Sequence, residues 1–138
     1  SFDQGILQAV GDAALGVVNT SQWSKDLDNP ANAAFVGSFE AEYGRLPSLY
    51  ASQGFDTAKL LISALEQADP SDPDAFRAAL KAADFDSTRG AFAFGPNQHP
   101  VQTIYAREVV QEGDVFTNRL IGPALENHAD AYAQDCRM

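Results

Sequence analysis

Apolar residues recur at helical spacing along four stretches of the chain. The start and stop signals are clearest in the second stretch. There Asn29 is suited to cap the helix, Pro30 takes the first helical position, and Gly44 follows the last turn. Gly16 ends the first stretch in a similar way. We therefore predict helices over residues 5–16, 30–43, 48–67 and 73–83.

Alternating and β-branched residues predict a small number of strands. The predicted strands cover residues 15–20, 87–97, 102–110 and 115–121. The first is expected to be buried on both faces, and the last two form an antiparallel hairpin. A short helix is expected over residues 125–132. Three or four strands are a thin sheet for this much helix, so the pattern predicts an α/β or α+β fold that is a piece of a larger protein.

Composition and charge narrow the possible partners. The 138 residues suit one domain, and nine basic against nineteen acidic residues give a formal net charge of −10. Because no Lys/Arg cluster is present to neutralise phosphates, we expect no nucleic acid and no anionic lipid as a partner. No apolar run approaches the ~20 residues of a membrane span, so no direct membrane insertion is expected. The first residues lack the regions of a signal peptide, which favours a mature protein or a fragment.

Residues suited to catalysis or metal binding are few. His99 and His128 are the only histidines, and no Gly-x-Ser-x-Gly motif accompanies them. The run Asp26-Leu-Asp-Asn resembles the start of a calcium loop but lacks its glycine and its distal glutamate. We therefore expect no enzyme, no catalytic residues, no metal and no cofactor. Cys136 is either a passive thiol or the partner of a cysteine elsewhere in a longer chain.

The remaining pattern is typical of a binding protein. Trp23, preceded by Gln22, lies in a loop directly after a predicted strand, and ligands of open α/β sheets gather outside the carboxyl ends of strands. The alternative is that Trp23 packs over the sheet edge as part of the core. Phe2 and Asp3 precede the first helix, where they form either a second loop of the same cleft or a frayed terminus.

Tyr50 is another candidate ligand residue, because it stands at the start of a helix. Free backbone N–H groups at such a position attract carboxylates. Gln53, one turn further on, would present its amide to the same space. The alternative for Tyr50 is an ordinary aromatic residue at a helix start. Together these residues predict a site for a small ligand.

Several short stretches, in this order and spacing, resemble one protein family. They are Gly11-Asp-Ala-Ala-Leu-Gly, Asp28-Asn-Pro-Ala-Asn, Tyr43-Gly-Arg-Leu-Pro-Ser, Gly54-Phe-Asp-Thr-Ala, Arg89-Gly-Ala-Phe-Ala-Phe-Gly-Pro-Asn and the ending from His128. The chain resembles the last third of periplasmic solute-binding proteins that serve branched-chain-amino-acid-type ABC transporters. The resemblance implies an α/β fold, the C-terminal fragment of a two-lobed type I periplasmic-binding fold whose lobes close on the solute.

The resemblance also implies a division of the chain. Residues 1–25 would belong to the second lobe, residues 26–98 to the helical part of the first lobe, and residues 99–138 would return to the second. The sheet of the first lobe would then be missing, which would expose the aromatic stripes of its helices. We therefore expect the isolated chain to self-associate or to be a proteolytic remnant.

The implied function is that of the extracytoplasmic solute-binding component of an ABC importer. The protein would lie in the periplasm, bind a branched-chain or aromatic amino-acid-like carboxylate, and meet a membrane permease. The alternative is the ligand-sensing input domain of a receptor with the same fold. In the family, Tyr50 and the loop around Trp23 correspond to cleft-lining positions, and the loop at Phe2–Gln4 lies near the group that grips the solute. An acidic residue there commonly holds an ammonium, a role open to Asp3, although relatives with a similar aromatic-rich loop often take aromatic acids.

Overall fold

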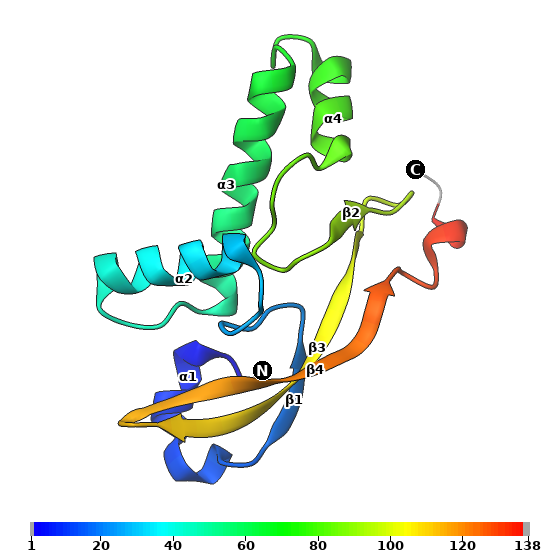
Figure 1. The fold of residues 1–138 in the computed structure, drawn as a ribbon. Coiled ribbons are helices and arrows are strands. Elements are labelled where there is room, and N and C mark those ends of the chain that lie inside the picture. Colours follow the sequence, from blue (N-terminus) through cyan, green and yellow to red (C-terminus); the bar gives the residue numbers. More distant parts are fainter. Residues whose placement is uncertain (1, 137–138) are drawn as a thin grey trace.

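The computed structural model describes residues 2–136, and Figure 1 shows how the elements are arranged. The chain begins with helix α1 (Gln4–Val10), the 3-10 helix η1 (Gly11–Ala14) and strand β1 (Val18–Ser21). Three helices follow: α2 (Pro30–Tyr43), α3 (Leu49–Gln67) and α4 (Pro73–Ala82). Strand β2 (Phe92–Phe94) leads into the long strands β3 (Pro100–Glu112) and β4 (Val115–His128), and the 3-10 helix η2 (Ala133–Asp135) comes last.

The three central helices begin and end where their sequence signals predict. Asn29 Oδ1 accepts a hydrogen bond from Ala31 N at 2.9 Å, and Pro30 occupies the first turn of α2. Gly44 closes α2 at φ 63°, a left-handed conformation that costs glycine little. Ser48 then caps α3. The boundaries predicted for these helices are confirmed to within one residue.

All four strands lie in one antiparallel sheet organised around β3. Strand β4 pairs with β3 from Glu112 opposite Val115 to Gln102 opposite His128. On the other edge of β3, β1 pairs with residues 105–108 and β2 pairs with residues 100–102. The prediction of an α/β fold with few strands and a C-terminal β-hairpin is confirmed.

The first helix and first strand differ from their predictions. Helix α1 ends at Val10, because Gly11 takes φ 61° and the chain continues as η1. Strand β1 is not buried on both faces: Val18 is 63% exposed, and only Ser21 of the strand is buried. The physical reason is that only one face of β1 is covered: Val18 and Thr20 share the exposed face, and Asn19 and Ser21 share the half-buried to buried one.

The predicted helix over residues 125–132 is wrong. Strand β4 passes through Gly122, at φ 156°, and continues with Leu125 opposite Ile104. Register shifts at this point let the long strand bend while it stays paired with β3. Backbone pairing with the first half of β3 therefore outweighs the local helical tendency of this short segment.

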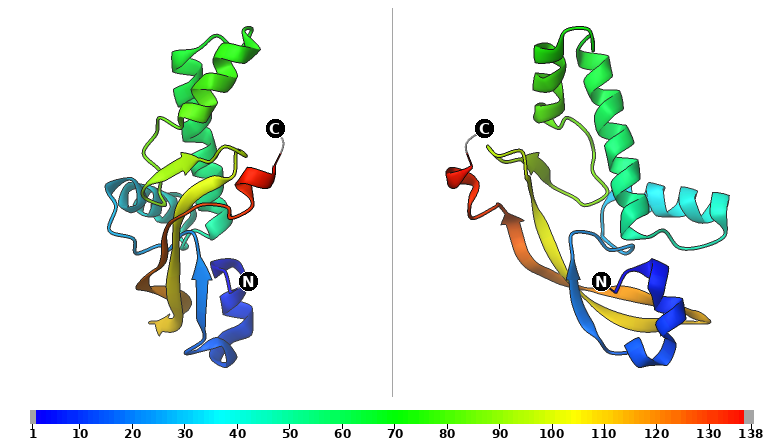
Figure 2. Two further views of the ribbon diagram at one scale, coloured as in Figure 1. Left: turned by 90° about the vertical axis from the view of Figure 1, so that its right-hand side faces the viewer. Right: turned by 180° about the vertical axis from the view of Figure 1, so that it is seen from behind.

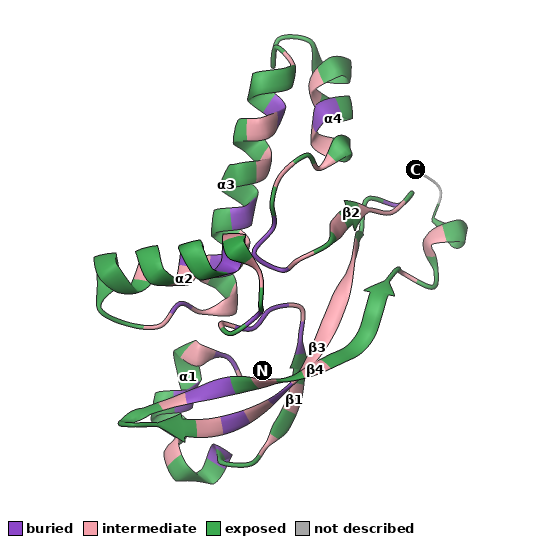
Figure 3. Ribbon diagram, in the orientation of Figure 1, coloured by how far each residue is buried: buried purple, intermediate pink, exposed green. Residues whose placement is uncertain are grey.

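Two small apolar cores hold the elements together. The first, called here the hairpin core, joins α1 and η1 to the β3–β4 hairpin through Leu7, Ala14 and Val109. The second, called the tryptophan core, consists of Trp23, Leu27 and Phe35 and joins the loop after β1 to α2. Figure 2 shows α3 and α4 extending away from the hairpin, and Figure 3 shows that much of their surface is exposed.

Large apolar side chains remain on the outer part of α3. Leu61, Ile62 and Leu65 are 43%, 55% and 53% exposed. The exposed residues here are aliphatic, whereas Phe35 and Phe39 of the expected aromatic stripe are buried and half-buried, so the expectation of an exposed aromatic stripe is not met at these two positions. No helix within residues 2–136 is long and apolar enough to cross a membrane.

Candidate functional site

The N-terminal loop, the loop after β1 and the first turn of α3 meet at one place, called here the junction. Asp3 Oδ1 accepts a hydrogen bond from Leu49 N at 3.0 Å, which joins the start of α1 directly to the start of α3. The other carboxylate oxygen accepts from Gly5 N at 3.5 Å and caps α1. Asp3 is only 5% exposed. It therefore lies in an ordered position and not in a frayed terminus.

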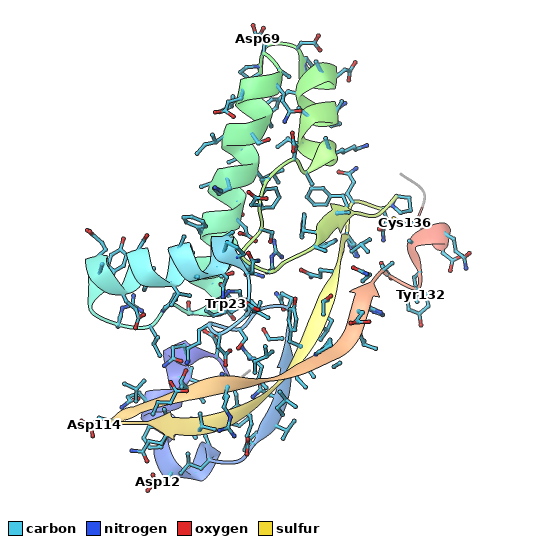
Figure 4. All side chains as sticks on the ribbon, in the orientation of Figure 1. Asp12, Trp23, Asp69, Asp114, Tyr132 and Cys136 are labelled. Atoms are coloured by element: carbon cyan, nitrogen blue, oxygen red, sulfur yellow. The ribbon has the colours of Figure 1, made fainter. Side chains whose placement is uncertain are left out.

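Trp23 lies in the interior beside α2, as Figure 4 shows. The side chain is 2% exposed, and its ring meets Phe35 edge-on at 6.2 Å between centroids. Its indole Nε1 donates to Asn32 Oδ1 at 2.7 Å. Asn32 is itself fully buried and donates to the carbonyl oxygens of Ser24 and Lys25. This arrangement fixes both the tryptophan and the loop that carries it.

The first turn of α3 presents Tyr50 to the outside. Its side chain is 68% exposed. Two neighbouring backbone N–H groups are already bonded, since Leu49 N donates to Asp3 and Ala51 N donates to Ser48 Oγ at 3.2 Å. The helix start is therefore largely capped from within the chain, and the exposed ring is the feature of Tyr50 that a ligand could contact.

The other predicted site residues do not gather at one place. Phe2 is half-buried, packs against the hairpin core, and accepts a hydrogen bond from Asn118 Nδ2 at its carbonyl oxygen. Gln22 is half-buried beside Trp23. Gln53 lines a separate hollow of about 330 Å³ between α3 and β2. Asp3 and Trp23 share one small hollow, and Phe2, Gln22, Tyr50 and Gln53 are outside its lining.

Arg107 is a buried cation that the sequence reasoning missed. It is 3% exposed and lies on β3, where Nη1 donates to Trp23 O at 3.0 Å and Nη2 donates to Asn19 Oδ1 at 2.7 Å. Burial lowers the pKa of Arg107, while the negative charges of Asp3 and Asp26 act in the opposite direction. An arginine among apolar residues in a predicted strand was the available signal.

A second missed group is a buried ion pair that anchors the loop after α4. Asp56 is 1% exposed and accepts hydrogen bonds from Ser87 Oγ, Thr88 N and Arg89 Nε at 2.6, 2.9 and 3.0 Å. Arg89 also donates to Gln102 Oε1 on β3 at 3.0 Å. The pair therefore ties α3 to the sheet through this loop.

The polar side chains at the junction are engaged with the protein itself. Among residues 2–136, no three His, Cys, Asp or Glu side chains lie close enough together to hold a metal ion. The polar groups at the junction are positioned by one another and by the backbone.

Comparison with known proteins gives the family. A family model for periplasmic binding proteins matches residues 1–114. The Leu/Ile/Val-binding protein homolog 6 of Brucella abortus (strain 2308) is 32% identical over 112 residues, which are 78% of this chain and 29% of that protein. The chain therefore spans about 29% of the length of the curated relatives it matches.

Solved structures agree with this assignment. An ABC transporter solute-binding protein from R. palustris in complex with benzoate has a TM-score of 0.83 and 36% identity, covering 97% of this chain and 36% of that one. Another, from Rhodopseudomonas palustris BisB5 in complex with 3,4-dihydroxy benzoic acid, has a TM-score of 0.81 and 30% identity, covering 94% and 36%. These matches confirm the predicted fold and indicate an extracytoplasmic protein of a non-enzymatic class. The chain belongs to the periplasmic binding protein family.

Proposed function

We propose that this chain is the C-terminal part of the solute-binding component of an ABC importer, and that the whole protein binds a small carboxylate with an apolar body. The relatives support this choice. Two solved structures at 30% identity or more hold benzoate and 3,4-dihydroxy benzoic acid, and the curated relatives are named for leucine, isoleucine and valine. These compounds share a carboxylate attached to an apolar group. The partner would be the membrane permease of the importer.

The proposal divides the chain between two lobes. Residues 1–25 and 99–138 form one unit, and residues 26–98 form the other. In support, α1, η1, β3 and β4 form the hairpin core, while α3 and α4 extend away from it (Figure 2). The solute would lie in the cleft between the lobes, and closure of the lobes would hold it with no bond made or broken.

The observation that carries the proposal is the meeting of three chain segments at the junction. Asp3, Trp23 and the first turn of α3 come from separate parts of the sequence. Asp3 accepts a hydrogen bond from Leu49 N and lines the same small hollow as Trp23. We propose that the exposed ring of Tyr50 contacts the solute directly. Trp23 is buried, so its part would be to support the wall of the cleft.

The test is isothermal titration calorimetry of the full-length protein with benzoate and with leucine. Tyr50→Ala is expected to weaken binding of the preferred solute by roughly tenfold, about the loss of one aromatic contact, with an unchanged melting temperature because the side chain is exposed. Tyr132→Ala is the matched control, since Tyr132 is 75% exposed and lies far from Trp23 in Figure 4. If neither solute binds the wild-type protein, the proposed solute class is wrong. If Tyr50→Ala binds the solute as tightly as the Tyr132→Ala control does, the proposed contact between Tyr50 and the solute is wrong.

A further inference from the structure

The side chain of Asp3 joins the start of α1 directly to the start of α3. Its hydrogen bond to Leu49 N spans 46 residues of sequence. Within the part of the chain that the structure describes, it is the only hydrogen bond between residues 2–20 and residues 26–98. Other hydrogen bonds, such as Trp23–Asn32 and Arg89–Gln102, also join the two proposed units, and the Asp3 bond is the one that joins the start of α1 to the start of α3.

The unit that carries Asp3 is firmly built. Helix α1 is fastened to β4 by hydrogen bonds from both of its glutamines. Gln4 Nε2 donates to Phe116 O at 2.9 Å and Gln4 Oε1 accepts from Thr117 Oγ1 at 2.8 Å, while Gln8 Nε2 donates to Asp114 O at 2.9 Å. The carboxylate of Asp3 therefore has a fixed place relative to the hairpin.

The unit that receives the bond is equally well held. Near the start of α3, Ser52 Oγ and Thr88 Oγ1 share a hydrogen bond of 2.8 Å, and both residues are fully buried. One turn later Asp56 forms its buried pair with Arg89. The position of Leu49 N is thus fixed by α3 and its loop, so the Asp3 bond connects two ordered bodies and not two loose segments.

The surroundings of Asp3 are unsuited to a solute ammonium. The hollow that Asp3 lines is also lined by Lys25 and Arg107, and the positive end of the α3 dipole lies at Leu49. Its volume is about 10 Å³, which is room for about one water molecule. An ammonium entering there would meet two cations and the positive end of a helix, and it would have to displace the bond to Leu49 N.

We propose that Asp3 is a positioning residue, and that it does not hold the solute. Its hydrogen bond to Leu49 N, called here the clasp, holds α1 against the start of α3. This rests on the proposed function and narrows its solute class. With Asp3 engaged by the protein itself, the site favours an apolar carboxylate without an ammonium group, such as a benzoate, over an amino acid.

The experiment uses the full-length protein and three variants. Asp3→Ala removes the acceptor, Asp3→Asn keeps an acceptor oxygen but removes the charge, and Asp12→Asn is the control on an exposed residue. The first readout is the exchange rate of the Leu49 amide in the absence of solute, resolved by mass spectrometry with fragmentation. The second is the affinity for benzoate and for leucine by calorimetry.

The clasp predicts a specific pattern. Asp3→Ala raises Leu49 exchange roughly fivefold to tenfold, the usual effect of removing a helix-capping acceptor, while Asp3→Asn raises it less and Asp12→Asn leaves it unchanged. Benzoate binds the wild type more tightly than leucine does, and Asp3→Asn keeps benzoate affinity within about threefold. Leu49 exchange that is the same in Asp3→Ala and in the wild type overturns the clasp.

Selective loss of leucine binding in Asp3→Asn, with benzoate binding intact, also overturns the proposal, because it shows that Asp3 holds an ammonium. Failure of the proposed function has a different signature. If the wild type binds neither solute while Leu49 exchange still rises in Asp3→Ala, the clasp stands and the assigned solute class is wrong.

Discussion

Replacing Asp56 with asparagine is expected to destabilise the chain strongly. The carboxylate is 1% exposed, and its charge offsets the guanidinium of Arg89, which is 8% exposed. Removing one partner of a buried ion pair leaves the other charge uncompensated and costs about 3–5 kcal/mol. Arg89 keeps its bond to Gln102 and its place over the Phe92 ring, at 4.6 Å from the centroid. We therefore expect the free energy of unfolding to fall by about 3 kcal/mol, the lower end of this range.

The assay is urea unfolding of the chain, followed by the fluorescence of Trp23, its single tryptophan. With a slope of about 2 kcal/mol/M, the expected cost lowers the unfolding midpoint by about 1.5 M. Asp74→Asn is the matched control. It removes the same charge from an exposed pair, Asp74–Arg77, whose side chains are 91% and 59% exposed. Such pairs contribute little, so the midpoint is expected to stay within about 0.3 M of the wild type.

A double variant separates the ion pair from other effects at the site. Replacing Arg89 with methionine in the Asp56→Asn background removes the uncompensated charge. The double variant should then cost less than the sum of the two single variants, by about 1–3 kcal/mol. A midpoint for Asp56→Asn that matches the Asp74→Asn control would refute the argument, because it would show that water or rearrangement replaces the carboxylate at little cost.

Three further predictions follow from other features. Asn32→Leu leaves the buried indole N–H of Trp23 without its acceptor and should cost about 1–3 kcal/mol in the same urea assay; no change would mean that the indole finds another partner. The pKa of Asp130 lies below its usual 3.8, chiefly because Tyr132 N donates to the carboxylate, so this contact adds stability above pH 3.8 that is lost as pH falls through the lower folded value. An NMR titration of Asp130 with a midpoint at or above 3.8 contradicts this. The isolated chain should sediment as a species larger than a monomer, and Leu65→Lys should shift it towards monomer; a compact, ordered monomer of the unmodified chain speaks against self-association.

The features predicted well from sequence depend on near neighbours. Asn29, Pro30 and Gly44 mark the ends of α2 because a cap, a first-turn proline and a left-handed glycine act within a few residues. Features that depend on distant pairing were missed. β4 continues beyond Ile121 only because the first half of β3 offers it backbone partners, and the Gly122-Pro123 step looks locally like a strand end.

The surroundings of the candidate site residues also depend on contacts between distant parts of the chain. The sequence named Asp3 and Trp23 from their places beside a helix and a strand, but it could not show that Asp3 bonds Leu49. It left two alternatives open for Trp23, and the structure places that residue in the tryptophan core. The Asp56–Arg89 pair joins residues 33 positions apart, and no local pattern marks such a pair.

The pairing of β1 with β3 sets the order in which the protein can form during its synthesis. Ser21 lies opposite Tyr105, and Gln4 of α1 bonds to Phe116 on β4. The N-terminal segment therefore leaves the ribosome long before its partners exist, and a helix of seven residues such as α1 is too short to persist alone. The β3–β4 hairpin pairs residues that are close in sequence, so it can form as soon as both strands have been synthesised. We expect α1 and β1 to pair with β3 and β4 only after residues 105–116 have been synthesised.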